Sequence, residues 1–372
     1  MSDRLNILVT GASGLVGAET TSRLVRAGHH VYGLVHNVGE IVANNGRRVS
    51  SAPWTAASAR ESGVVRLLRG DVTRPRFGLD SETWSSLSAS LDRIVHCAAI
   101  TDFGRPPEIY QQINVTGTVH ALELAQENAT PFVHVSTAYV CGNRDGVIAE
   151  NELDVGQRFG NAYEESKMRA ELIVRKAAAD GLPATVVRPS VVTGTVRSGR
   201  VREFKNIYIV LKLLSKGLVS AIPGHFDACV DLVPVDHVAA VLTAATEDFD
   251  RARDLTLHAV GAPVRMRDVS DTFAEYPSFH VPRYLDPNTF TPDCLSRVEK
   301  KYYERVVSLY DNYFLRRQRF DSAIADRFVR RPSTAGSSYL RRLIDYALKA
   351  GYLGSTLPVA DRALTPLKVG ER

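Results

Sequence analysis

In the first half of the chain, short apolar runs alternate with longer amphipathic stretches. The amphipathic stretches have helical periodicity and cover Glu19–Ala27, Tyr110–Asn128 and Tyr163–Ala179. The apolar runs between them have the length of buried strands: Leu5–Val9, Val31–Val35, Val64–Leu68, Arg93–Cys97, Phe132–Ser136 and Thr185–Arg188. Strand and helix in regular alternation predict an α/β fold, a doubly wound parallel sheet of the Rossmann type.

The alternation ends near Val201. Residues 203–219 are expected to be helical, and Ile222-Pro223-Gly224 should break that helix. Two apolar runs, 231–235 and 255–260, are expected to return to the sheet, and from Pro263 onward the pattern is mostly helical. We therefore expect a nucleotide-binding domain in residues 1–200 with a return segment at 231–260. An interleaved, mostly helical substrate lobe would take 201–230 and 261–372.

The composition is that of a folded protein, and the excess positive charge lies in the last quarter of the chain. The 372 residues are 44% hydrophobic and 23% charged, which is typical of a folded globular protein. The formal net charge is +5, but residues 283–372 alone hold 17 Lys and Arg against 10 Asp and Glu. Residues 316–319, Arg-Arg-Gln-Arg, are expected to be a solvated helix face or, alternatively, a docking patch. No nucleic-acid recognition motif accompanies this basic region.

The four cysteines are far apart and form no CxxC pair, so neither a disulfide framework nor a metal site is expected. The N-terminus has no signal-peptide pattern, and no apolar run is long enough to span a bilayer. A soluble, cytoplasmic protein is expected, with an oligomeric state that the sequence leaves open.

A glycine-rich segment joins the first strand to the first helix. Glycines in such a turn let the backbone approach a pyrophosphate, which the helix N-terminus then stabilises. The spacing is GxxGxxG, and the alternative is a tight turn without a ligand. The residues expected to contact a dinucleotide here are Thr10, Gly11, Ser13, Gly14, Leu15, Val16 and Gly17.

The second strand ends at His36 without the carboxylate that usually binds the ribose of NAD. His36, Arg47 and Arg48 could instead neutralise the 2′-phosphate of NADP. The sequence therefore favours NADP(H) over NAD(H), although the two arginines could equally be solvated loop charges.

Tyr163 and Lys167 are spaced to lie one turn apart on the same face of a helix. The ammonium group would lower the pKa of the phenol, and the phenol would protonate a carbonyl as hydride arrives. Thr137 follows the Phe132–Ser136 strand, and its hydroxyl could bind the same carbonyl. By itself the YxxxK spacing is also common on an exposed helix face.

Together, the TGASGLVG loop, the strand-end Ser-Thr and the YxxxK motif resemble the extended short-chain dehydrogenases/reductases. The resemblance implies that Thr137, Tyr163 and Lys167 form a catalytic triad supported by Asn114, and that Lys167 also holds the nicotinamide ribose. It also implies further cofactor contacts at Asp71, Val72, Ala98, Ala99, Pro189 and Val191.

Two segments indicate which branch of the extended short-chain dehydrogenases/reductases the chain resembles. Gly70–Leu79 resembles the GDxxxPxxGL segment of thioester reductase domains and fatty acyl-CoA reductases, and Asp231–Val238 resembles their DLVPVDxV segment. Ala98–Phe103 is similar to their AAxxxF stretch, whereas His36 stands where thioester reductases usually have Arg.

The resemblance implies NADPH-dependent reduction of an acyl thioester to an aldehyde, with further reduction to an alcohol left open. A free-standing reductase is expected, which takes its thioester from coenzyme A or from an acidic carrier protein that the basic C-terminal region could attract. Two alternatives remain: an extended short-chain enzyme acting on a ketone or nucleotide-sugar, such as a ketoreductase, epimerase or dehydratase, and a non-enzymatic cofactor-sensing scaffold.

Overall fold

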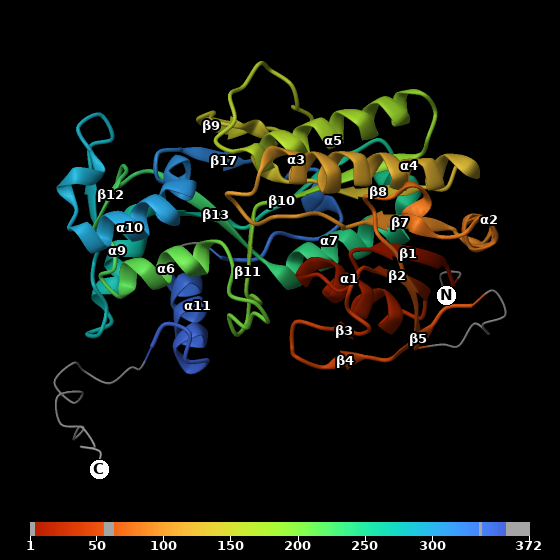
Figure 1. The fold of residues 1–372 in the computed structure, drawn as a ribbon, viewed down its shortest axis with the longest axis horizontal. Helices are drawn as coiled ribbons and strands as arrows, with labels where there is room; N and C mark the ends of the chain where they lie inside the picture. Colours follow the sequence, from red (N-terminus) through yellow and green to blue (C-terminus); the bar gives the residue numbers. More distant parts are fainter. Residues whose placement is uncertain (1–3, 56–62, 335–336, 355–372) are drawn as a thin grey trace, which may run out of the picture.

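The computed structural model describes residues 4–55, 63–334 and 337–354. Its main sheet has eight parallel strands in the order β14-β10-β8-β7-β1-β2-β6-β5 (Figure 1). These strands are β1 (Asn6–Thr10), β2 (His30–Val35), β5 (Ser51–Pro53), β6 (Val65–Arg69), β7 (Arg93–His96), β8 (Phe132–Val135), β10 (Ala184–Pro189) and β14 (Thr256–Ala259). The predicted Rossmann-type sheet is confirmed.

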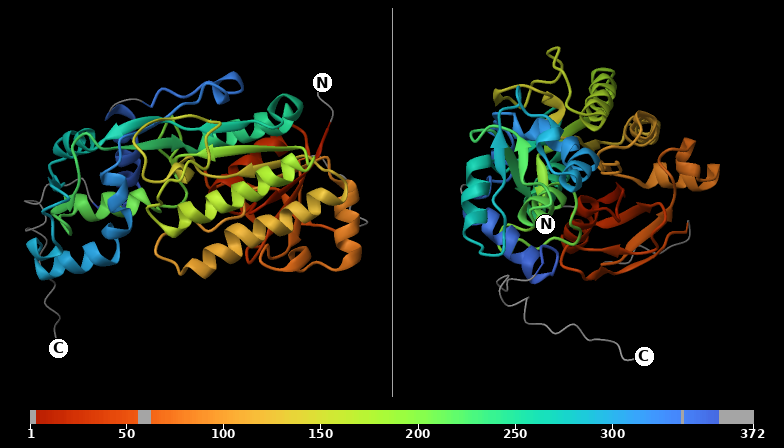
Figure 2. Two further views of the ribbon diagram at one scale, coloured as in Figure 1. Left: turned by 90° about the horizontal axis from the view of Figure 1, so that it is seen from above. Right: turned by 60° about the vertical axis from the view of Figure 1, so that its left-hand side comes forward.

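Helices cover both faces of this sheet, as a fully buried parallel sheet requires (Figure 2). One face packs against α1 (Leu15–Arg26) and α7 (Val235–Glu247). The other packs against α2 (Ser81–Ser90), α4 (Gly117–Glu127) and α5 (Ala162–Ala179), with α4 and α5 side by side. The helix α4 follows α3 (Pro107–Tyr110) through one π-helical segment, η2 (Gln111–Thr116).

Shorter elements complete this part of the chain. They are β3 (Ile41–Val42), β4 (Arg48–Val49), η1 (Pro75–Gly78), η3 (Ala138–Cys141), β9 (Gly146–Ile148) and α8 (Phe249–Ala252). The strands β3 and β4 form a hairpin between β2 and β5. Residues 42–63 thus contain short strands, of which β5 joins the main sheet, while residues 56–62 lie outside the described chain.

The described residues of the predicted substrate lobe lie mostly toward one end of the molecule (Figure 2). Residues 325–327 are an exception, because they contact β14 of the main sheet. Two strands that come wholly or mostly from residues predicted for the nucleotide-binding domain belong with this lobe: β11 (Val191–Thr193) and β13 (Cys229–Pro234). Its other elements are α6 (Ile207–Ser215), β12 (Ala221–Pro223), β15 (Ala262–Arg265), α9 (Met266–Ala274), β16 (Arg283–Leu285), η4 (Pro292–Cys294), α10 (Arg297–Arg305), η5 (Val307–Phe314), β17 (Gln318–Phe320), η6 (Ala325–Arg327) and α11 (Ser337–Lys349). A large buried cluster from α6, β13, η5 and α11 forms its core.

Two sequence expectations about this lobe are wrong. The 231–235 run does not return to the main sheet, because β13 pairs with β11 and β15 in a separate three-stranded sheet. There the buried Asp231 carboxylate accepts hydrogen bonds from the Ser190 hydroxyl and, at 2.8 Å, from the Gly261 amide. Residues 316–319 are not a solvated helix face either: Gln318 begins β17, which pairs with β9, and Arg316 is buried.

Candidate active site

The glycine-rich loop packs closely against the end of β7. Gly11 has a φ of +63°, and a Cβ atom at this position would lie 2.8 Å from the Cα of Ala98. At Gly17 a Cβ atom would lie 2.2 Å from the carbonyl oxygen of Gly11. Glycine is therefore required at both positions, and α1 begins at once with no acidic residue in its first turn. An uncompensated helix N-terminus behind a tight glycine loop fits the pyrophosphate of a dinucleotide.

The two polar residues predicted in this loop connect it to its surroundings. Thr10 is buried, and its hydroxyl pairs with Nδ1 of His96 at 2.8 Å while it accepts the Ala98 amide at 3.2 Å. The carbonyl of Ser13 accepts a 2.9 Å hydrogen bond from the Arg202 guanidinium, which belongs to the segment before α6. These contacts hold the loop between the end of β7 and the segment before α6.

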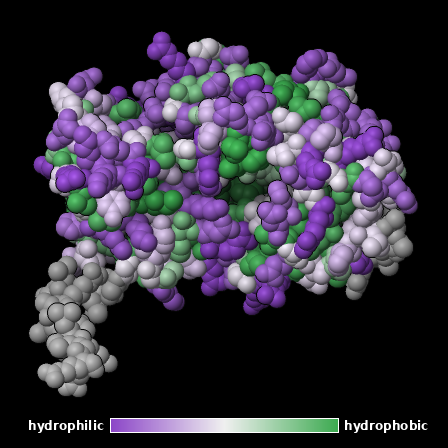
Figure 3. Space-filling view, in the orientation of Figure 1, coloured by the Kyte–Doolittle hydropathy of each residue, from purple (hydrophilic) through white to green (hydrophobic). Residues whose placement is uncertain are grey.

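A cavity of about 280 Å³ lies beside this loop, at the carboxyl ends of the central strands. In the orientation of Figure 1, Figure 3 shows the surface hollowed between α1 and α6, with apolar residues in the hollow. Eleven of the predicted site residues line the cavity: Gly11, Gly14, Leu15, Val16, Gly17, Ala99, Thr137, Tyr163, Lys167, Pro189 and Val191. The structure thus brings the glycine loop and the predicted triad to one cavity.

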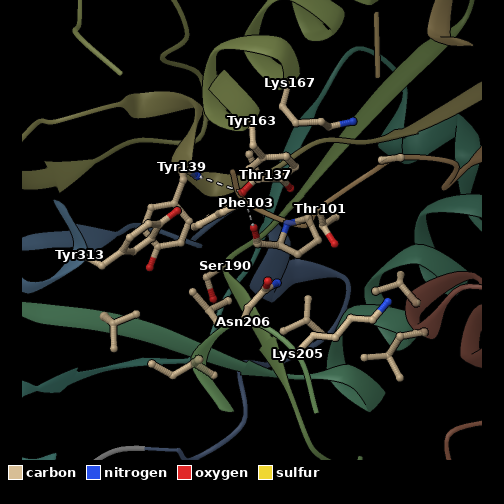
Figure 4. Close-up of a pocket in the computed structure, with 18 of the residues that line it drawn as sticks. Thr101, Phe103, Thr137, Tyr139, Tyr163, Lys167, Ser190, Lys205, Asn206 and Tyr313 are labelled. Carbon is tan, nitrogen blue, oxygen red and sulfur yellow. Dashed lines mark hydrogen bonds between the residues drawn. The ribbon is translucent and has the colours of Figure 1, made fainter. Parts of the chain in front are cut away.

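The triad residues come from the end of β8 and the first turns of α5 (Figure 4). Thr137 donates its hydroxyl to the carbonyl of Pro189 and accepts the amide of Tyr139, both at 3.3 Å. Burial raises the pKa of the Tyr163 phenol, and hydrogen bonding with Thr137 acts in the opposite direction. Burial also lowers the pKa of Lys167 to about 8, while the Glu171 carboxylate partly opposes this. The net shift of the phenol's pKa is upward, so the lowering expected from Lys167 is not found. At neutral pH the site therefore holds a neutral phenol and a buried ammonium group, both carried by α5.

Asn114 lies outside the cavity lining, in the π-helical segment η2. Its side chain accepts the amide of Ile100 at 2.9 Å and donates to the carbonyl of Ile100 at 3.2 Å. It also donates to the hydroxyl of Ser166 at 2.9 Å. The residue therefore joins the segment after β7 to α5, near the residues with which it was predicted to act.

The residues predicted near the adenosine half of the cofactor lie away from the cavity, around the ends of β2 and β6. His36 is exposed directly after β2, close to the carboxylate of Asp71. Arg47 is exposed in the β3–β4 hairpin, and Arg48 pairs with Glu40 at 2.8 Å. The carbonyl of Val72 accepts a 2.8 Å hydrogen bond from the ring of His120. The roles of these residues remain predictions.

Several lining residues were absent from the predicted site: Thr101, Phe103, Tyr139, Ser190, Lys205, Asn206 and Tyr313 (Figure 4). The Phe103 ring lies 5.8 Å from that of Tyr163 and 5.9 Å from that of Tyr313, measured between centroids. Thr101 and Phe103 belong to the AAxxxF stretch, which could have indicated them. Asn206 and Tyr313 carry no local signal, because their place depends on how the substrate lobe packs.

Comparison with known proteins identifies the family. An NAD-binding family model described as "Male sterility protein" matches residues 9–242. The chain belongs to this family.

Individual relatives agree with this membership. The L-2-aminoadipate reductase large subunit of Candida glabrata is 26% identical over 284 residues, which are 70% of this chain and 20% of that protein. The chain thus spans about a fifth of that relative's length. The structure of the terminal R domain from the myxalamid PKS-NRPS biosynthetic pathway is 25% identical, has a TM-score of 0.75, and is matched over 95% of this chain and 92% of that one. A UDP-galactose 4-epimerase structure shares the fold at 18% identity and a TM-score of 0.62, over 93% and 99% of the two chains.

These findings confirm the assignment to the thioester reductase and fatty acyl-CoA reductase branch of the extended short-chain dehydrogenases/reductases. Among the described residues, no helix is both long and apolar enough to cross a bilayer. In the same part of the chain, no three His, Cys, Asp or Glu side chains are grouped to hold a metal ion.

In this family member an ion pair joins the predicted substrate lobe to the start of α5. Glu164, which follows Tyr163, is fully buried and accepts two hydrogen bonds from Arg316, at 2.8 and 3.0 Å. The hydroxyl of Tyr313 donates to the same carboxylate at 2.8 Å, and the amide of Gly160 donates to it at 3.1 Å. Arg316 therefore positions the lobe against the helix that carries the phenol.

We expect Arg316→Met to lower the free energy of unfolding by about 3–5 kcal/mol, because the Glu164 carboxylate would remain buried without its cation. The neighbouring Arg317 is the matched control: it pairs with Asp227 at 2.7 Å on the surface, and both side chains are about half exposed. Arg317→Met should cost no more than about 1 kcal/mol. Urea unfolding of the two variants measures the difference, and equal losses would contradict a structural role for Arg316.

Proposed function

We propose that this protein reduces an acyl thioester, held on a carrier protein or coenzyme A, with NADPH as the reductant. The observation that carries the proposal is that Thr137, Tyr163 and Lys167 line one cavity together with the glycine loop Gly11–Gly17. Family membership and the name of the aminoadipate reductase relative support it. The missing carboxylate after β2 favours NADPH over NADH.

The domain roles follow from the same arrangement. Residues 1–200, with β14 from the 231–260 segment, would bind the dinucleotide. Residues 201–230 and 261–372 would bind the acyl group and its carrier. The cavity surface supplied by α6, β13 and η5 is mostly apolar or aromatic, with Tyr208, Val210, Val230, Tyr310 and Phe314 among its residues. Such a wall suits an uncharged acyl group.

In the proposed mechanism, the bound reduced nicotinamide supplies hydride to the thioester carbonyl carbon. The Thr137 hydroxyl would turn from the carbonyl of Pro189 to the substrate, so that Thr137 and Tyr163 both donate hydrogen bonds to the carbonyl oxygen. Tyr163 passes its proton to that oxygen as negative charge develops. The Lys167 ammonium stabilises the resulting phenolate. When the C–S bond breaks, the proton leaves with the sulfur, by way of Tyr163, and the products are an aldehyde and a free thiol.

Charge in the cavity argues against a nucleotide-sugar as substrate. Among the described residues that line it, the charged ones are Lys167, Glu203 and Lys205. Lys205 is paired with Glu203 at 3.0 Å, and Lys167 lies beside the phenol in the proposed mechanism. A sugar diphosphate would need cationic partners in the substrate half, where the wall is apolar and aromatic.

The proposal is tested by offering NADPH with a panel of acyl-CoA and carrier-bound thioesters, and in parallel with ketones and nucleotide-sugars. We expect NADPH oxidation with thioesters, matched by release of one thiol per aldehyde formed. Turnover of a ketone or nucleotide-sugar, with no thiol released from any thioester, would refute the proposal in favour of the alternative enzyme class.

A further inference from the structure

Asn206 has an unusual backbone conformation at the entry to α6. Its φ is +50° and its ψ is −114°, a region that side chains with a Cβ atom rarely adopt and that glycine adopts easily. Asn206 occupies the N-cap position, where an asparagine side chain normally accepts an amide of the first turn. Here the side chain makes no such capping bond. Neither backbone preference nor helix capping therefore explains an asparagine at this position.

The side chain of Asn206 instead lines the cavity. In Figure 4 its carboxamide points toward Ser190 and Thr137, whereas Lys205, the preceding residue, extends away from them. The strained backbone thus turns two neighbouring side chains to different parts of the cavity. Asn206 faces the part where Thr137 and Tyr163 would meet the reacting carbonyl.

The segment before α6 holds Asn206 in place from both sides. Arg202 donates to the carbonyl of Ser13 in the glycine loop, and its own amide donates to the Asn44 side chain, both at 2.9 Å. On the other side, the hydroxyl of Tyr208 accepts the amide of Gly194 at 2.9 Å. Conformations of this kind persist where the surroundings enforce them, and they concentrate at ligand sites.

The neighbours that α6 itself contributes to the cavity wall are mostly apolar: Ile207, Tyr208 and Val210. A carboxamide both donates and accepts hydrogen bonds, so it matches a carbonyl or amide group of a ligand. An acyl thioester on a pantetheine arm carries both kinds of group.

We propose that Asn206 is a substrate-binding residue, whose carboxamide hydrogen-bonds a carbonyl or amide of the acyl thioester beside Thr137 and Tyr163. This inference rests on the proposed function. The strained backbone of Asn206 is retained because glycine, which would fit the conformation better, cannot supply the hydrogen bond.

The test is Asn206→Gly, which removes the carboxamide and relieves the strain in a single change. We expect a Tm equal to or above that of the wild type, a KM for the thioester raised about tenfold, and an unchanged Kd for NADPH. Asn206→Asp, which keeps the size of the side chain but loses the N–H donor, should raise the KM as well. The matched control is Ala129→Gly, because Ala129 is an exposed non-glycine residue with a φ of +50° outside the cavity. It should leave both KM and Kd unchanged.

Three results with Asn206→Gly would overturn the inference: an unchanged KM for the thioester, a Tm below that of the wild type, or a Kd for NADPH raised as much as the KM. The last result would assign Asn206 to the nicotinamide carboxamide. In each of these cases the wild type still turns over thioesters, so the proposed function stands. A wild type that reduces no thioester would overturn both.

Discussion

Tyr163→Phe is expected to bind NADPH as tightly as the wild type and to lose about 100- to 10,000-fold of its thioester turnover. The ring remains in place against Phe103, so the shape of the cavity is kept. The variant lacks the proton donor. Of the triad hydroxyls, Thr137 alone then remains to donate a hydrogen bond to the carbonyl oxygen as negative charge develops there. Fluorescence titration gives the Kd for NADPH, and steady-state assays give kcat and kcat/KM.

The control for this variant is Tyr302→Phe, since Tyr302 is 38% exposed on α10 and does not line the cavity. It should turn over as the wild type does. If Tyr163→Phe keeps wild-type turnover, Tyr163 has no part in the proton transfer. If it loses NADPH binding as well, its role is structural.

Deprotonation of Lys167 is expected to lower the activity at high pH. Burial lowers the pKa of its ammonium group to about 8, so kcat/KM should fall as the pH rises through about 8 and the charge beside the phenol is lost. Lys167→Met should lose most turnover, by about 100-fold or more, and should lose this pH dependence with it. A wild-type profile that stays level to pH 10 would contradict a protonated Lys167 as the active form.

The burial of Lys167 also predicts that the stability of the folded protein rises over the pH range in which its activity falls. The folded pKa of about 8 lies below the ordinary value of 10.5, so holding Lys167 charged in the folded protein is unfavourable at neutral pH. This penalty, about 3 kcal/mol, is present below pH 8 and disappears as the pH rises from about 8 to 10.5. Lys167→Met should therefore be more stable than the wild type at pH 7, and this advantage should vanish near pH 10.5.

Lys176 is the matched control on the same helix, because its side chain is 76% exposed and pairs with Asp180 at the surface. Lys176→Met should alter neither turnover nor the pH dependence of unfolding beyond about 0.5 kcal/mol. Chemical denaturation of both variants across this pH range measures the effect. Equal behaviour of Lys167→Met and Lys176→Met would show that burial of Lys167 carries no penalty.

Much of the nucleotide-binding half could be predicted from local sequence. Buried parallel strands are continuous apolar runs, so the run at 5–9 marks β1 and the run at 132–136 marks β8. The helical spacing of Tyr163 and Lys167 places both on one face, and the chain order of a doubly wound sheet carries the end of β8 to the same crevice. These features depend on near neighbours in the sequence.

The rest depends on packing between distant segments, which no local pattern shows. Arg316 stands in a run of basic residues typical of a surface, yet its partner Glu164 lies 152 positions earlier and is buried with it. The continuous, buried run of β13 suits either sheet, and the choice is made by its pairing with β11 and β15. Asn206 is indicated by its backbone conformation, and that is visible in the structure alone.

The most direct test of the central claim is the fate of hydride when NADPH labelled with deuterium at the transferable position is supplied with an acyl thioester. The account predicts one deuterium on the carbonyl carbon of the trapped aldehyde for each NADPH oxidised, together with one free thiol. It also predicts loss of this product in Tyr163→Phe. An unlabelled aldehyde, or NADPH oxidation without release of thiol, would contradict it.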